Sequence, residues 1–197
     1  MRLLVIRHGE SEADILHVHE GRADFDLTKR GRQQAEAMSR YVCRNYKIEK
    51  IYASPLKRAA QTAELLSSAV GIPVLYEDRL MEFNNGLLAG LGYAEADARY
   101  PKMDVPLHEA VYEQESKLSF RFRAEYMLSK ILSENPDEST AAVVTHGGMI
   151  DQMYKAFLRL PISTDAYFYT DDTGIHEWVI SGKVRRVEKA NCRMHLL

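Results

Sequence analysis

Two short apolar runs, each ending in a histidine and a glycine, place the strongest limit on how this chain can fold. Leu3–Ile6 leads into Arg7-His8-Gly9-Glu10, and Ala141–Thr145 leads into His146-Gly147-Gly148. Short apolar runs followed by helical patterns indicate parallel strands with helices on both faces of the sheet. A lone histidine beside a strand is usually a satisfied polar residue. Two in matching contexts favour one crevice at the carboxyl ends of the strands.

Length and composition fit a single α/β domain. The chain has 197 residues, 46% of them hydrophobic, which is enough for a substantial core. Its formal net charge of −2 argues against a nucleic-acid partner. No apolar stretch approaches the ~20 residues of a membrane span and no leader pattern is seen, so we expect a cytoplasmic protein without a membrane partner. Cys43 and Cys192 form no CxxC pair or disulfide framework, and we interpret both as structural.

Helix signals alternate with the strand signals along the chain. Thr28 is expected to cap a helix. Ser54-Pro55 predicts a second helix start, with Arg58 in or just after its first turn and its end at Gly71. The other expected elements are strands at 50–53 and 72–76, helices at 118–132 and 149–160, and a terminal hairpin of Ile175–Ile180 and Val184–Val187.

The region between Phe83 and about Ser116 loses periodicity because glycines and prolines interrupt it. We interpret residues 83–117 as a small, loop-rich cap insertion able to cover an active site, within one domain of residues 1–197. The alternative is an ordinary surface excursion. The terminal hairpin would form an exposed sheet edge, which would allow a homodimer.

The polar residues at the expected strand ends and helix starts suit a tetrahedral anion. Arg7 and Arg58 offer forked donors that match phosphate, and the Gly147 amide would open a helix whose N-terminus favours negative charge. A neutral His8 opposite such an anion can attack phosphorus in line and form a phosphohistidine. Glu82, if burial keeps it protonated, can protonate the leaving oxygen and then activate water. Neither a metal nor another cofactor is required.

Four segments, in this order, resemble the histidine phosphatase superfamily, also called phosphoglycerate-mutase-like. They are Arg7-His8-Gly9-Glu10-Ser11, Leu27-Thr28-x-x-Gly31-x-x-Gln34-Ala35, Ser54-Pro55-x-x-Arg58-x-x-Gln61-Thr62 and His146-Gly147-Gly148, and the ending with Asn191 and His195 is also similar. The resemblance spans nearly the whole chain. It implies a three-layer αβα sandwich with a mostly parallel central sheet.

The resemblance also implies the roles of the site residues. His8 would be the phosphorylated nucleophile, and Arg7, Arg58 and His146 would hold the phosphoryl group. Glu82 would be the proton donor. Ser11 and the Gly147 amide would add further donors. Members of the family work without a metal and divide between phosphatases and mutases.

Asp14 departs from the family pattern, which commonly has an asparagine that donates to the phosphate at this position. Two unit charges about 4 Å apart interact by roughly 4 kcal/mol at an effective dielectric constant near 20, so an ionised Asp14 beside a phosphate dianion would weaken binding strongly. Either Asp14 faces solvent, or the phosphate site is weakened or shifted toward acid pH.

The insertion favours hydrolysis over mutase chemistry. Between Asn84 and Lys117 its only cations are Arg99 and Lys102, whereas the mutases that this family includes carry a paired-arginine element. We expect a metal-independent phosphomonoester hydrolase of the histidine acid type that acts on small phosphorylated metabolites. One alternative is phosphoglycerate-mutase-type transfer. A second is a catalytically weakened module that binds a phospho-ligand or a protein.

The leaving group of the substrate is the least constrained part of this interpretation. The acidic residues of the insertion would favour a substrate with positive charge or hydroxyl groups, such as an amino sugar, a nucleoside or phosphoserine. The alternative is a solvated acidic surface. Candidates for lining the leaving-group pocket are His17, His19, Tyr93, Tyr112 and His176, and the alternative for each is a structural or exposed side chain.

Overall fold

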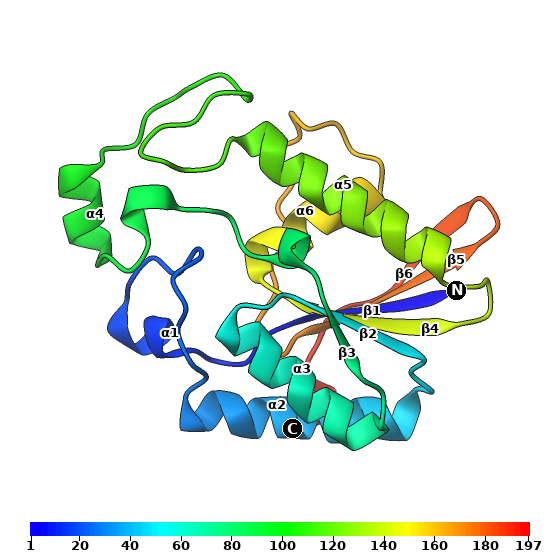
Figure 1. Cartoon of the computed structure of the whole chain (residues 1–197). Coiled ribbons are helices and arrows are strands. Elements are labelled where there is room, and N and C mark those ends of the chain that lie inside the picture. The colour runs from blue at the N-terminus through cyan, green and yellow to red at the C-terminus, as the bar shows by residue number, and fades with distance from the viewer.

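Six strands form one sheet, in the order β3-β2-β4-β1-β5-β6, in a computed structural model that describes all residues, 1–197 (Figure 1). The first four strands along the chain run parallel, and the last two form an antiparallel hairpin at one edge. The sheet is therefore mostly parallel, as predicted. The strands are β1 (Arg2–Arg7), β2 (Lys50–Ala53), β3 (Val74–Tyr76), β4 (Thr140–Thr145), β5 (Ile175–Ser181) and β6 (Val184–Cys192).

Six α-helices accompany the sheet. They are α1 (Glu12–Leu16), α2 (Lys29–Asn45), α3 (Lys57–Val70), α4 (Tyr93–Arg99), α5 (Lys117–Glu134) and α6 (Gly147–Phe157), with short 3-10 turns at Asp78–Leu80, Gly86–Leu88 and Met194–Leu196. Figure 1 shows α5 and α6 on one face of the sheet and α2 and α3 on the other. No helix combines the length and the apolar character needed to cross a membrane.

The alternation of side chains along β1 produces these layers. Leu3 and Val5 belong to the core beneath α5 and α6, whereas Leu4 and Ile6 belong to the core beneath α2 and α3. All four side chains are completely buried, as expected for a strand covered on both faces. The predicted three-layer αβα sandwich is confirmed.

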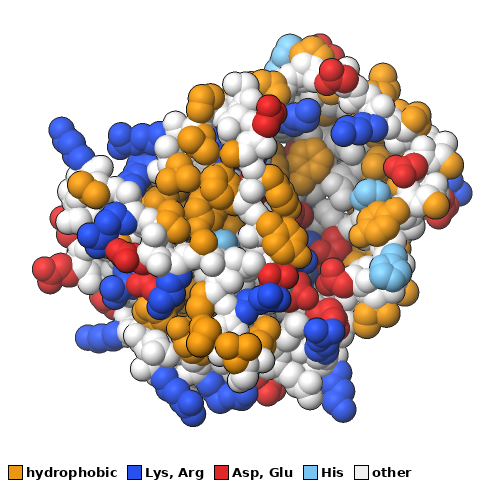
Figure 2. Space-filling model, turned by 180° about the vertical axis from the view of Figure 1, so that it is seen from behind, with side chains coloured by type: hydrophobic (Ala, Val, Ile, Leu, Met, Phe, Trp, Pro, Cys, Tyr) orange, Lys and Arg blue, Asp and Glu red, His pale blue; other side chains and the backbone are white.

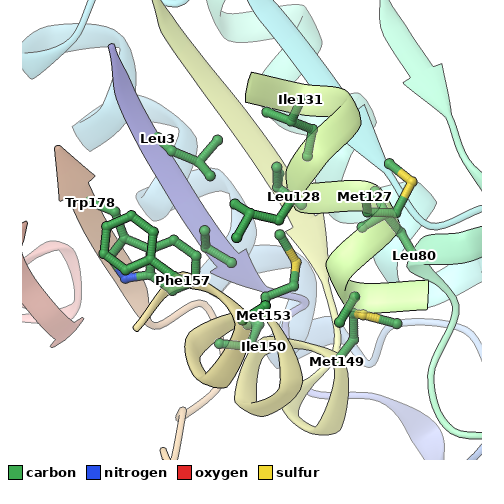
Figure 3. Packing of buried hydrophobic residues seen from close by; sticks show 14 of the residues in the cluster. Leu3, Leu80, Met127, Leu128, Ile131, Met149, Ile150, Met153, Phe157 and Trp178 are labelled. Atoms are coloured by element: carbon green, nitrogen blue, oxygen red, sulfur yellow. The ribbon is translucent and has the colours of Figure 1, made fainter. Parts of the chain in front are cut away.

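The larger core fixes the position of α6 on the sheet. Trp178 of β5 stacks on Phe157 of α6 with ring centroids 4.6 Å apart, while Met149 and Met153 of α6 fill the space toward α5 (Figure 3). Each such buried side chain contributes roughly 2–3 kcal/mol of hydrophobic stabilisation. This packing holds the N-terminus of α6 at the carboxyl edge of the sheet, directly after β4.

Most predicted boundaries of helices and strands lie close to the observed ones, and one predicted helix start is wrong. Thr28 caps α2, since its Oγ1 accepts a hydrogen bond from Gly31 N at 2.9 Å. Gly71 ends α3 in the left-handed conformation with φ 73°. The Ser54-Pro55 pair, however, lies before α3, which begins at Lys57 after Leu56. The Ser54 hydroxyl instead contacts His146.

The segment between Glu82 and α5 is loop-rich, but it contains α4, which the sequence did not predict. Another short helix, α1, lies in the polar loop after β1. Figure 1 shows α1 and α4 on the same side of the molecule. Backbone hydrogen bonds join the two loops, from His19 N to Leu91 O at 2.9 Å and from Gly90 N to His19 O at 2.8 Å.

Candidate active site

His8 and His146 come together because β1 and β4 are neighbouring parallel strands. The ladder pairs Arg7 with Thr145, so the residue after each strand enters the same space. His8 N donates to Thr145 O at 3.0 Å, and the two imidazole centroids are 5.1 Å apart. Both rings are buried. The expectation that the two histidines share one site is therefore met by the geometry.

The backbone fixes the orientation and the tautomer of His8. Its Nδ1 lies 2.7 Å from the Gly9 carbonyl oxygen, which can only accept a hydrogen bond, so Nδ1 carries the proton. Nε2 then presents its lone pair to the pocket, where Arg58 Nε donates to it at 3.2 Å. Burial, and then the charges of Arg58 and Arg7, hold the pKa of His8 well below 6.5. The ring is therefore neutral and oriented at neutral pH, as the role expected for it requires.

Gly9 allows the turn that carries His8 to pack against α2. A Cβ at this position would collide with the Gly31 carbonyl, so the close approach of the two backbones requires glycine. Gly9 N donates to Thr62 Oγ1 of α3 at 3.2 Å. The turn that carries His8 is thus held by helices on the α2 and α3 face.

Arg58 lies at the start of α3 and is completely buried. Besides the contact with His8, its Nη1 donates to Ala23 O at 3.0 Å and its Nη2 to Gly21 O at 2.8 Å. A planar guanidinium makes these three bonds in fixed directions. Arg58 therefore joins His8 to the loop that follows α1.

Arg7 leaves one donor free. Its Nη1 donates to Thr170 O at 2.9 Å, and its Nη2 lies 3.2 Å from Asp172 Oδ1. Its Nε is buried without a partner. A buried donor without a partner is costly, which indicates a position where a ligand oxygen would be bound.

His146 also has an unused ring nitrogen. Its Nε2 lies 2.8 Å from Ser54 Oγ, and Ser54 Oγ itself accepts from Leu56 N at 3.3 Å, so the hydroxyl proton is free to donate to Nε2. The other nitrogen, Nδ1, is buried without a partner, and it carries the ring proton when Ser54 donates to Nε2. Burial and the Arg58 charge hold the pKa of His146 well below 6.5. The Gly147 amide, first in α6, has no intrahelical partner either.

Glu82 lies at the mouth of this pocket, next to the N-terminus of α6. Its Oε2 accepts from Gly148 N at 2.9 Å, and its Oε1 accepts from Phe83 N at 2.7 Å. The side chain is partly exposed. A Cβ on Gly148 would lie 2.5 Å from Glu82 Oε1. Only glycine at position 148 therefore lets the carboxylate lie against this turn.

Asp14 lies at the rim of the site. The sequence left open whether it faces solvent or weakens the phosphate site, and the structure places it between these two possibilities. Its side chain is 36% exposed, and its Oδ1 is 3.9 Å from Arg7 Nη2. Its Oδ2 accepts from Ser11 N at 2.8 Å and from Ser11 Oγ at 3.1 Å, which caps α1. Ser11 Oγ also contacts Glu20, so in the free protein the Ser11 hydroxyl faces two carboxylates.

Sequence reasoning missed Glu20, a carboxylate that lies closer to the His8 ring than Asp14 does. Its Oε1 is 3.3 Å from Arg58 Nε and its Oε2 is 3.8 Å from His8 Nε2. Burial raises its pKa, although Arg58 and Ser11 act in the opposite direction. The only signal for Glu20 was its place in the loop that joins the His8 turn to α2, which has to pass near the nucleophile.

The candidates for a leaving-group pocket divide into two groups. A cavity of about 320 Å³ has a lining that includes His19, Phe83 and Tyr112, and the first two are sequence neighbours of Glu20 and Glu82. Tyr93 packs edge-on against His19, with ring centroids 4.8 Å apart. Figure 2 shows this face of the molecule, which is hollowed between the segment that carries α4 and the rest of the molecule. Acidic side chains lie along the lower edge of the hollow.

The other two candidates lie elsewhere. His17 is exposed at the end of α1. His176 is buried in β5, where its Nε2 bonds to Thr170 Oγ1 at 2.8 Å and its Nδ1 lies 3.1 Å from Tyr154 Oη. Its place in the core excludes it from the pocket, so His17 and His176 agree with the alternative of an exposed or structural side chain.

Comparison with known proteins places the chain in a family. Phosphoserine phosphatase 1 of Hydrogenobacter thermophilus is 30% identical over 203 residues, covering 100% of this chain and 94% of the relative. A probable phosphoglycerate mutase of Erwinia tasmaniensis is 29% identical over 208 residues, covering 100% and 95%. The solved structure of a mycobacterial glucosyl-3-phosphoglycerate phosphatase with VO3 has a TM-score of 0.85 at 25% identity, covering 97% and 99%.

The match to a family as a whole is equally extensive. Residues 3–193 match the histidine phosphatase superfamily (branch 1), which includes all four segments that carry the resemblance in the sequence. The chain belongs to the histidine phosphatase superfamily, branch 1.

Proposed function

We propose that this protein is a metal-independent phosphatase that hydrolyses small phosphomonoesters through a phosphohistidine at His8. The observation that carries the proposal is the arrangement around His8 Nε2. Arg58 Nε donates to the lone pair of this nitrogen at 3.2 Å in the free protein, and two further buried nitrogens, Arg7 Nε and His146 Nδ1, have no partner. A tetrahedral dianion would satisfy these donors and lie in front of the nucleophile.

The first half-reaction transfers the phosphoryl group to His8. Nε2 forms a bond to phosphorus while the bond from phosphorus to the leaving oxygen breaks in line with it. The charge on the equatorial oxygens is stabilised by Arg7, Arg58, His146 and the Gly147 amide. Glu82 has to carry a proton at this step; it gives that proton to the leaving alkoxide, and the alcohol departs.

The second half-reaction regenerates the enzyme. Glu82, now a carboxylate, removes a proton from a water molecule that attacks phosphorus. The bond between phosphorus and His8 Nε2 breaks, and inorganic phosphate leaves. Because Nδ1 keeps its proton on the Gly9 carbonyl throughout, His8 returns as the same neutral tautomer.

The cavity beside Glu82 supports a substrate with a partly apolar leaving group. Its lining comprises His19, Phe83, Leu88, Asp97, Tyr100, Lys102, Met103, Val111, Tyr112, Gln114 and Lys117. Asp97 is the only lining residue among the acidic residues of the insertion, and two lysines accompany it. This lining does not support a purely cationic leaving group. We therefore infer an alcohol with a ring or apolar portion and mixed polar groups, and that residues 83–117 act as the cap over it.

The mutase alternative is supported by a relative named as a probable phosphoglycerate mutase. One observation argues against the mutase: Arg123, the arginine next to Glu82, already forms hydrogen bonds within the protein. Its Nη1 donates to Met81 O at 2.8 Å, and its Nη2 donates to Glu115 Oε1 at 2.6 Å. No pair of free arginines is left there to hold the carboxylate of a phosphoglycerate. The cytoplasmic location and the homodimer expected from the sequence stay predictions.

Hydrolysis of an aryl phosphate in the presence of a chelator tests the proposal. Wild type should release phosphate, and His8→Ala should not. The matched control is His17→Ala, which removes an exposed histidine outside the site and should retain wild-type turnover. Interconversion of phosphoglycerates without net hydrolysis would favour the mutase. Absence of both reactions would favour the remaining alternative, a catalytically weakened module that binds a phospho-ligand or a protein.

A further inference from the structure

The Glu20 carboxylate contacts three of the groups that bind or attack the phosphoryl group in the proposed reaction. It contacts Arg58 Nε at 3.3 Å, the Ser11 hydroxyl, and His8 Nε2 at 3.8 Å. In-line attack requires phosphorus about 3–3.5 Å from the nucleophilic nitrogen. A phosphoryl group at that distance needs the Arg58 and Ser11 donors that Glu20 holds in the free protein, so the two anions compete for the same donors.

We propose that Glu20 is an internal competitor for the phosphate site, filling it in the free enzyme and giving way when a phosphomonoester binds. This inference rests on the proposed function and adds a specificity-determining residue to it. Every phosphate ligand has to displace or neutralise the same carboxylate. Only ligands with further contacts, such as a leaving group in the cavity that begins at the neighbouring His19, recover the free energy that this displacement costs.

The surroundings of Glu20 explain both its position and its pH response. The charged and titratable groups that face it are Arg58 from α3, Arg7 and His8 from the end of β1, and Asp14 from α1. The two arginines attract the carboxylate into the site. Burial nevertheless raises the pKa of Glu20, so this group takes up a proton at less acid pH than an exposed glutamate. Competition is therefore strongest at neutral and alkaline pH and fades toward acid pH.

Direct binding of sulfate, measured by titration calorimetry, tests the competition without requiring turnover. Sulfate is a tetrahedral dianion over the whole range between about pH 5.5 and pH 8, so its own charge does not change. For wild type, sulfate should bind more tightly at the lower pH. Glu20→Gln keeps the size of the side chain and removes its charge, and at about pH 8 it should bind sulfate about 10- to 100-fold more tightly than wild type.

Three further variants separate the possible causes of tighter sulfate binding: removal of a side chain from the site, loss of a negative charge, and new contacts made by an introduced amide. Glu12→Gln removes an exposed carboxylate of the same loop and should leave sulfate binding unchanged. Asp14→Asn removes a carboxylate that lies beside Arg7 but does not fill the site, so its gain should be smaller than that of Glu20→Gln. Glu20→Ala removes the side chain without adding an amide donor, and it should also bind sulfate more tightly than wild type.

The outcomes decide between the possibilities. A gain in both Glu20 variants that shrinks at about pH 5.5 supports the competitor. An equal gain in Asp14→Asn overturns it, because charge alone would then account for the effect. A gain in Glu20→Gln without one in Glu20→Ala also overturns it, because the new amide would be responsible. Absence of sulfate binding in every protein overturns it too, whereas a failure of the phosphatase proposal would appear separately as absence of hydrolysis.

Discussion

Gly148→Ala offers a specific test of the role assigned to Glu82 because it moves the carboxylate without removing it. The new Cβ would lie 2.5 Å from Glu82 Oε1 and 3.1 Å from Cδ, so the side chain has to leave its place. The hydrogen bond from Gly148 N to Oε2, 2.9 Å long, would be lost with it. The fold should tolerate the change, since alanine stabilises a helix by up to about 1 kcal/mol relative to glycine.

The expected loss depends on the leaving group. General acid catalysis contributes about 10²- to 10⁴-fold, so displacing Glu82 should lower kcat/KM for alkyl phosphates by about 100-fold, or roughly 2.7 kcal/mol of transition-state stabilisation. An aryl phosphate with an acidic phenol needs little protonation of its leaving oxygen. Its kcat/KM, which reports phosphoryl transfer to His8, should fall by less than about tenfold.

The assay compares kcat/KM for one alkyl and one aryl phosphate in wild type, Gly148→Ala, Glu82→Gln and the double variant. In the Glu82→Gln background the alanine should have little further effect, because the group that it displaces is already inactive. Equal losses for both substrates would refute the assignment of Glu82 as the proton donor. So would a wild-type rate in Gly148→Ala or additive losses in the double variant.

Three other predictions follow from the site and its surroundings. Asp14→Asn should tighten phosphate binding by no more than about fivefold, because partly exposed charge pairs are worth about 1 kcal/mol or less, and equal or weaker binding would contradict this. Arg58→Lys keeps the charge but not the three directed bonds, so kcat/KM should fall by about 100-fold or more, and a loss under tenfold would count against the guanidinium geometry. Burial lowers the pKa of His176 to about 4. Because the unfolded chain then binds more protons below about pH 6.5, the contribution of this histidine to stability is complete above that pH and lost as the pH falls toward 4. Urea unfolding between about pH 7 and pH 5 should therefore show a smaller loss of stability for His176→Gln than for wild type, and parallel losses would show that this histidine does not titrate as described.

The parts of the site that the sequence predicted are those attached to regular structure. His8 and His146 follow neighbouring strands, and Arg58 lies at a helix start. The spacing of apolar residues and the order of the elements along the chain were therefore enough to predict that these three residues share one site. The layers of the fold follow from the same pattern, since alternate residues of β1 enter two different cores. Strand ends and helix starts are positions that local sequence patterns determine.

The parts that were missed are set by tertiary contacts. Glu20 lies in an irregular loop, and its direction depends on Arg58, which holds that loop through the Gly21 and Ala23 carbonyls. Ser54 suited a helix cap on local grounds, but His146, 92 residues away, takes its hydroxyl as a partner. His176 has a polar side chain, yet the core of β5 satisfies both of its nitrogens. None of these contacts leaves a periodic signal in the sequence.

The central claim is that the reaction passes through a phosphohistidine at His8. The most direct measurement is to quench the enzyme in alkali during turnover with chelator present and to determine the mass and site of any bound phosphoryl group, since phosphohistidine survives alkali and is lost in acid. The account predicts one phosphoryl group on His8 that forms and decays fast enough to support turnover and is absent from His8→Ala. Turnover without this species, or turnover that persists in His8→Ala, would contradict it.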